Sequence, residues 1–162
     1  MEMNSRMKEL LDKNGIEIPG SLQPLHHALQ TILDSGVVEF RACFFLKALL
    51  GRDFDIDRAL EESIDKTELE ASVNTIFIQA IIYEKPYKIK IDEKLLLEQG
   101  LSYGYRLKEK LREYGFFNVI LSLSSADEGI VDCNVRFFLF RERAEWIKDN
   151  LEDYLEEAII LF

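Results

Sequence analysis

The sequence predicts an α+β fold in which a helical N-terminal third packs on a mostly antiparallel sheet of about four to five strands, followed by a C-terminal acidic helix. Two observations predict this class. Glycine-punctuated segments with apolar residues at helical spacing fill the first third, and segments with two-residue alternation follow from about residue 72. No repeat or linker interrupts the 162 residues, so a single domain, 1–162, is expected.

Two helices are predicted near the N-terminus. The first begins at a cap, Asn4 or Ser5, and runs to about Lys13 with a glycine just after its end. The second begins at Ser21, carries a proline in its first turn, and ends before Gly36.

The run VVEFRACFFLKALLG, residues 37–51, is apolar nearly all round. This pattern predicts a buried central helix, although VVEF alone also fits a strand. A further short helix follows, with Asp55 or Asp57 as its cap.

The pattern then changes from helical spacing to alternation. VNTIFIQAIIY, residues 73–83, predicts a strand, and YKIKID, residues 87–92, predicts an edge strand because outward lysines discourage further pairing. Two helices are expected next, the first closed by Gly100 and the second by Gly115.

Residues 117–124 and 130–140 form the strongest predicted hairpin, joined by a four-residue loop, 126–129. Alternation places Cys133 on the core face and Asp132 and Asn134 on the other face. That second face is mixed in character, so either a helix covers it or it is open to a partner.

The last segment, from Glu142 to at least Glu157, is predicted to be helical, and residues 158–162 either finish this helix or form a short strand. On a helix the acids would form a stripe about 60° wide, with Trp146 beside them and the aliphatic residues opposite. Residues 142–162 hold seven acids and two bases, so the stripe has few neutralising neighbours. We therefore expect a partner-binding surface that consists of Glu145, Trp146, Asp149, Glu152, Asp153 and Glu156.

The formal net charge of −10 disfavours nucleic acid and anionic membrane as partners and favours a basic protein. The only cysteines, Cys43 and Cys133, lie in apolar runs, which favours free buried thiols over a disulfide. No apolar leader or spanning segment is evident, so we expect a cytoplasmic protein.

Motifs for catalysis are weak. The only histidines, His26 and His27, are adjacent and cannot share a metal as residues one helical turn apart can, although a pairing with a cysteine or serine elsewhere stays open. Residues 53–57 (DFDID) look like the start of a calcium loop, but the glycine and glutamate that such a loop needs later are missing. We expect no metal, no cofactor and no enzymatic activity.

The ending VDCNVRFFLFRERAEWIKDNLEDYLEEAIIL resembles the strand-then-acidic-helix ending of immunity proteins from bacterial polymorphic-toxin and contact-dependent inhibition systems. The resemblance covers roughly the last fifty residues and assigns no individual functional residue. It implies stoichiometric, non-catalytic binding to a basic toxin domain. A general interaction or phage-type module without an inhibitory role is the first alternative, and a small-molecule binder or enzyme is the second.

Overall fold

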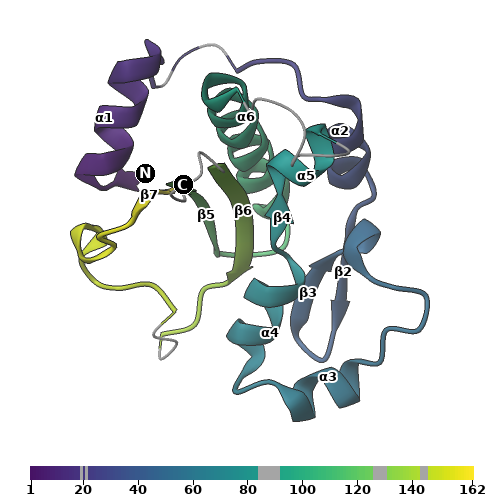
Figure 1. Cartoon of the computed structure of the whole chain (residues 1–162). Helices are drawn as coiled ribbons and strands as arrows, with labels where there is room; N and C mark the ends of the chain where they lie inside the picture. The colour runs from purple at the N-terminus through teal and green to yellow at the C-terminus, as the bar shows by residue number, and fades with distance from the viewer. Residues whose placement is uncertain (19, 21, 84–91, 126–130, 143–145) are drawn as a thin grey trace.

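The computed structural model describes residues 1–18, 20, 22–83, 92–125, 131–142 and 146–162. The fold is α+β, as the sequence predicts. Figure 1 shows the chain, and its elements in order are β1 (Glu2–Met3), α1 (Ser5–Asn14), α2 (His27–Asp34), β2 (Val37–Phe40), β3 (Cys43–Leu46), the 3₁₀ helix η1 (Lys47–Leu49), α3 (Ile56–Glu62), α4 (Lys66–Val73), β4 (Ile76–Phe77), α5 (Ile78–Ile82), α6 (Glu93–Leu111), β5 (Phe117–Ser125), β6 (Val131–Leu139), η3 (Leu151–Asp153) and β7 (Glu157–Leu161).

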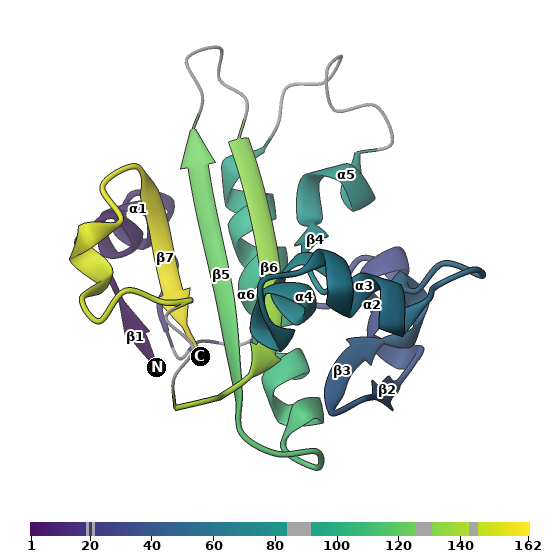
Figure 2. The same cartoon turned by 90° about the horizontal axis from the view of Figure 1, so that it is seen from below.

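Five strands form the main sheet in the order β1-β7-β5-β6-β4, and every neighbouring pair is antiparallel. Figure 2 shows this order from β1 at one edge to β4 at the other. The predicted hairpin of β5 and β6 is confirmed, with Leu123 opposite Cys133 and Ser122 opposite Asn134. Cys133 is fully buried and Asp132 is exposed, so the register follows the alternation in the sequence.

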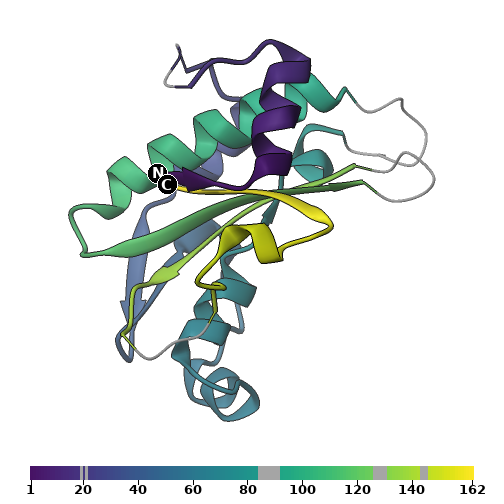
Figure 3. The same ribbon diagram turned by 90° about the vertical axis from the view of Figure 1, so that its left-hand side faces the viewer.

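The two faces of the main sheet are covered by different elements (Figure 3). α1, α2, α5 and α6 pack on one face and enclose the largest core with the inward residues of β5, β6 and β7. On the other face, the C-terminal segment and α4 enclose a smaller cluster around Ile120, Phe138 and Ile159. The mixed face of the hairpin is therefore partly covered, by a loop segment and a helix.

The first helix, α1, matches its prediction. The Asn4 side chain accepts a hydrogen bond from the Met7 N–H, and Gly15 ends the helix in the left-handed conformation, at φ 64°. α3 also matches, because the Asp55 carboxylate accepts from the N–H groups of Asp57 and Arg58. α2 begins at His27, later than predicted, and Ser21 lies outside the described residues.

The predicted central helix within residues 37–51 is wrong, because this run forms the two-stranded sheet of β2 and β3 and then η1. The alternative of a strand at VVEF is confirmed, since β2 is Val37–Phe40. The chain reverses at Arg41 and Ala42, which both have positive φ, 54° and 60°. Their carbonyl oxygens accept hydrogen bonds from the side chains of Lys66 and Arg141, at 2.7 and 3.0 Å. These long-range contacts hold a turn that favours glycine or asparagine and that the local sequence does not announce.

The predicted strand over residues 73–83 is confirmed only at Ile76–Phe77, because α5 begins directly after it. The Gln79 side chain in α5 then takes the place of a paired strand: it accepts from the Cys133 N–H at 3.0 Å and donates to Asp132 at 2.8 Å. The edge strand predicted at residues 87–92 and the hairpin loop at residues 126–129 lie outside the described residues, apart from Asp92, which caps α6.

The helix boundary predicted at Gly100 is also wrong, because α6 continues through it as one helix. A Cβ atom at Gly100 would lie 2.7 Å from Leu121 and 3.1 Å from Cys133. The glycine therefore allows α6 to approach the sheet closely, and this contact explains its position in the middle of the helix.

Candidate functional site

The C-terminal acidic helix predicted from Glu142 is wrong. Asn150 caps a single turn of 3₁₀ helix, η3, and the chain then enters β7, which pairs with both β1 and β5. Residues 158–161 are thus strand, the second of the two predicted alternatives. Ala158, Ile159 and Ile160 are all buried, because both faces of β7 are covered.

Without the helix, the predicted acidic stripe does not form, and its members separate into different environments. Glu145 lies outside the described residues. Trp146 is half-buried, with its ring 6.4 Å from that of Phe138, so it packs on the second face of the sheet and is not a free anchor. Asp149, Asp153 and Glu156 are exposed.

Glu152 has a structural task. Its carboxylate accepts hydrogen bonds from the backbone N–H and the hydroxyl of Ser5, each at 2.9 Å, and so caps the start of α1. These two donors hold the pKa of Glu152 below its usual range. The contact joins the C-terminal segment to the N-terminal helix.

The remaining acids of the segment stay available. Asp149, Asp153 and Glu156 form no ion pair with any other residue in the described ranges. The nearest base in sequence, Lys148, donates to the Asp153 backbone carbonyl at 2.8 Å and lies over the Tyr154 ring. Leu155, 72% exposed, is an exposed apolar side chain of the same segment.

A groove lies between this segment and the second face of the sheet; we call it the C-terminal groove. It has a volume of about 300 Å³. Its apolar lining comes from β6, β7 and the C-terminal segment: Phe138, Phe140, Ile147, Leu151 and Leu161. Its polar lining consists of Glu2, Asn118, Arg141, Glu142, Lys148 and Asp149.

The groove lining has a negative charge balance, because its three carboxylates exceed its one base, Lys148, that no carboxylate pairs with among the described residues. Arg141 is paired with the fully buried Glu70, at 2.7 Å, and Lys148 is held as described above. Glu2, Glu142 and Asp149 appear in no ion pair among the described residues. A lining that combines apolar side chains with carboxylates in no ion pair among the described residues suits a ligand that is both apolar and positively charged.

Two phenylalanines stand at the end of the sheet next to this groove. Phe140 is 56% exposed and Phe116 is 87% exposed, and the Phe140 N–H donates to the Phe116 carbonyl at 2.9 Å. Only Phe140 lines the groove. Exposed aromatic rings beside a groove are typical of binding surfaces.

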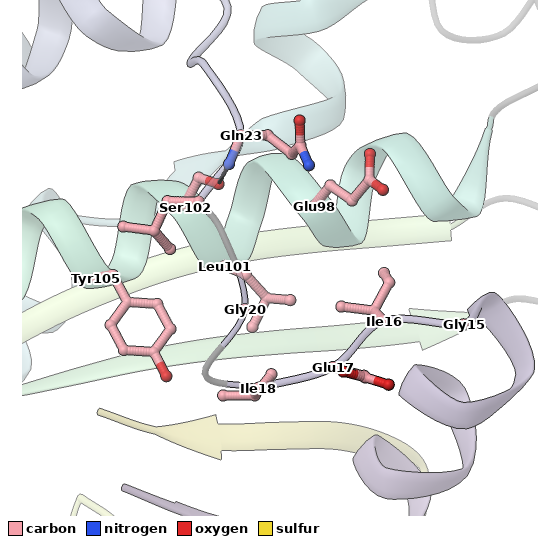
Figure 4. A pocket seen from close by; sticks show the side chains of 11 residues that line it. Gly15, Ile16, Glu17, Ile18, Gly20, Gln23, Glu98, Leu101, Ser102 and Tyr105 are labelled. Atoms are coloured by element: carbon pink, nitrogen blue, oxygen red, sulfur yellow. Dashed lines mark hydrogen bonds between the residues drawn. The ribbon is translucent and has the colours of Figure 1, made fainter.

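A second cavity, also about 300 Å³, lies between residues 15–23 and α6. Figure 4 shows its lining, with Glu98, Leu101, Ser102 and Tyr105 projecting from α6. Its hydroxyl groups have structural partners: Ser102 accepts from the Gln23 N–H at 2.9 Å, and Tyr105 donates to Met1 Sδ at 2.9 Å. No histidine or cysteine lines it, so this cavity offers no nucleophile–base pair among its described residues.

The candidate catalytic residues from the sequence are not brought together. Cys43 and Cys133 are both free and buried, and burial raises the pKa of each thiol. The His26 and His27 rings lie 4.4 Å apart and tilted, and the backbone N–H of His26 donates to Gln99 Oε1 at 2.7 Å. The only aromatic partner of these rings within the described part of the chain is the other histidine.

The calcium interpretation of Asp53, Asp55 and Asp57 has little support in the geometry. Asp55 caps α3, and Asp57 pairs with Arg41 at 3.1 Å. Across the described ranges, no three His, Cys, Asp or Glu side chains gather as a possible metal site. The absence of a metal therefore stays a prediction.

A family model matches residues 2–162. The chain belongs to the Uncharacterized protein PM0498 family. Searches of the curated proteins and of the solved structures returned no match. Within the residues that the structure describes, no helix has the length and apolar character needed to cross a membrane.

The sequence indicated the exposed acids of the C-terminal segment but did not indicate the groove that Asp149 lines. Glu2 and Leu161 reach the groove only because β1 and β7 pair at the edge of the sheet, a contact between the two ends of the chain. The one available signal was the mixed second face of the hairpin, which includes Asn118, Phe138 and Phe140.

Proposed function

We propose that this chain is a non-catalytic protein-binding protein whose C-terminal surface holds a basic partner. The surface comprises Asp149, Asp153, Leu155, Glu156 and the C-terminal groove. The observation that carries the proposal is the set of exposed carboxylates on the C-terminal segment that form no ion pair among the described residues, one of which, Asp149, lines the C-terminal groove. Charge of this kind steers a basic protein toward the surface, and apolar contacts then slow its dissociation.

The finer form of the proposal is an immunity or inhibitor protein that neutralises a basic toxin domain in the cytoplasm. The resemblance of the C-terminal sequence and the net charge of −10 support it. Trp146 and Glu152 are left out of the proposed surface, because one packs inside the fold and the other caps α1.

The test compares three proteins: wild type, the triple variant Asp149→Lys/Asp153→Lys/Glu156→Lys, and the control Glu39→Lys/Asp53→Lys/Glu61→Lys. The control acids are also exposed, and they belong to the region of β2 and α3, remote from the C-terminal segment in Figure 1. Both triples change the net charge equally. Any difference between them therefore reports the location of the charge.

Each protein serves as bait in a native lysate, and a captured partner is then purified and its association measured at low and high salt. We expect a basic partner that binds wild type and the control at similar rates. Its association with the C-terminal triple should be at least about tenfold slower at low salt. Equal rates for both triples, or an acidic partner, would contradict the proposal. For the inhibitor form, the partner must also lose its activity at a 1:1 ratio.

A further inference from the structure

We propose that the C-terminal groove takes an arginine side chain of the basic partner, an assignment that rests on the proposed function and names what the site recognises. An arginine side chain has two parts with opposite demands. Its methylene stem favours apolar surroundings, whereas its planar guanidinium favours carboxylates and the faces of aromatic rings.

The groove offers both kinds of surroundings in one place. Ile147, Leu151 and Leu161 provide an apolar lining for the stem. Glu2, Glu142 and Asp149 provide carboxylates that have no ion-pair partner among the described residues. A charged side chain that enters such a groove keeps its charge balanced while its stem leaves water.

The aromatic wall favours arginine over lysine. Phe140 is more than half exposed and lines the groove, next to the buried ring of Phe138. A planar guanidinium stacks on such a ring and can still donate hydrogen bonds sideways to carboxylates. An ammonium group is compact and strongly hydrated, so it gains less from the same wall.

The groove lining also contains two bases, Arg141 and Lys148, and both donate to other groups of the fold. The Arg141 guanidinium donates to Glu70, to Thr67 and to the carbonyls of Ala42 and Leu139. Lys148 Nζ donates to the Asp153 carbonyl. Among the described residues of the lining, the three carboxylates therefore exceed the one base whose charge is not balanced, Lys148, and favour an incoming cation.

The test uses a short probe peptide, acetyl-glycyl-arginyl-glycinamide, titrated into ¹⁵N-labelled protein and followed by amide chemical shifts. Two peptides serve as comparisons, with citrulline or lysine in place of arginine. Citrulline keeps the shape of arginine and removes its charge. We expect saturable shifts at Asn118, Lys148, Asp149 and Leu161 with the arginine peptide, weaker ones with lysine, and none with citrulline.

Two variants and one matched control locate the binding. Phe140→Ala should weaken the arginine peptide about two- to fivefold, and Asp149→Asn should weaken it by a similar factor. Phe116→Ala is the control, since Phe116 is also exposed and neighbours Phe140 but does not line the groove. It should leave the affinity unchanged.

Three results would overturn the arginine site: equal shifts with citrulline, shifts spread over the acids of α3 and α4, or full affinity in both groove variants. Each of these is separate from the outcome of partner capture. A captured basic partner that binds Phe140→Ala and Asp149→Asn at full strength would leave the protein-binding function standing and reject the groove. If the arginine peptide binds the groove but no basic partner is captured, the arginine site is supported and the protein-binding function is rejected.

Discussion

Replacing Glu70 with alanine should destabilise the protein by about 3–5 kcal/mol, because it breaks a buried ion pair. Glu70 is fully buried on α4, and its two carboxylate oxygens accept from the backbone N–H groups of Phe44 and Leu139 at 2.8 and 2.9 Å. The same oxygens accept from Arg141 at 2.7 and 3.1 Å. The carboxylate thus joins β3, β6 and the chain after β6 at one point.

The magnitude follows from what the substitution leaves behind. Two backbone N–H groups lose their acceptor, at about 1–3 kcal/mol each where they stay buried. The Arg141 side chain, only 24% exposed, loses its counter-ion but keeps the Ala42 and Leu139 carbonyls. The total loss of about 3–5 kcal/mol is about a third or more of the free energy of unfolding of an ordinary domain.

Urea unfolding measures this loss, with fluorescence of the single tryptophan, Trp146, as the probe. Glu61→Ala on α3 is the matched control, because that glutamate is exposed and its loss should change stability by about 0.5 kcal/mol or less. A loss below about 1 kcal/mol for Glu70→Ala would show that the carboxylate does not hold β3 to β6. The free energies of unfolding of wild type and variants can be compared only if the dependence of that free energy on urea concentration is the same in each protein.

Three further predictions concern other contacts of the fold. Gly100→Ala should lower the urea midpoint more than Gly104→Ala, because its new methyl group meets the fully buried side chains of Leu121 and Cys133, whereas that of Gly104→Ala meets the half-buried ring of Phe162. Equal midpoints would refute this. Stability should fall as pH rises above 9.0, the ordinary pKa of a thiol, because burial raises the pKa of Cys43 and Cys133 in the folded chain, so the unfolded chain loses these protons first. The Cys43→Ala/Cys133→Ala variant should therefore show a urea midpoint that changes less between pH 8 and 10, and an equal change in both proteins would refute this. The pKa of Glu152 is lowered in the folded protein, so its charged form stabilises the fold above the ordinary pKa of 4.5, and this stabilisation is lost as pH falls through the lowered pKa. Glu152→Gln should therefore be less stable than wild type near neutral pH. In thermal melts from pH 7 to pH 3, its stability should also decrease less than that of wild type.

The parts of the fold that were predictable are those whose pattern is set by neighbouring residues. The hairpin of β5 and β6 alternates over nine residues in each strand, so its faces and register follow from the sequence. The caps at Asn4 and Asp55 are likewise local, since each side chain bonds an N–H two or three residues away. Both kinds of feature were predicted correctly.

The parts that failed depend on contacts between distant segments. Residues 37–51 have the composition of a buried helix, yet Lys66 and Arg141 hold the turn that makes them a hairpin. Gln79 supplies a side-chain substitute for strand pairing 54 residues away, and this lets α5 replace a strand. No pattern within either segment reports such partners, so periodicity alone gave the wrong element.

The C-terminal segment shows how the same limit affects a candidate site. Its aliphatic residues do fall at helical spacing, but Leu151 is buried while Leu155 is 72% exposed, which a helix packed along one face would not show. The acids kept their surface position because a charged side chain stays in water in either structure. The sequence therefore predicted the exposure of the described acids, but it failed for Leu155 and Trp146 and for the arrangement of the segment.

This distinction decides which acids can be tested for binding. A carboxylate that already accepts hydrogen bonds from the fold, as Glu152 does from Ser5, contributes to stability, and its reversal would weaken the protein together with any complex. A carboxylate without such partners, as at Asp149, can be reversed with little effect on folding. A charge-reversal experiment that includes Glu152 would confuse the two effects. Leaving Glu152 intact while Asp149, Asp153 and Glu156 are reversed separates binding from stability, so a loss of association in that triple must come from the surface itself.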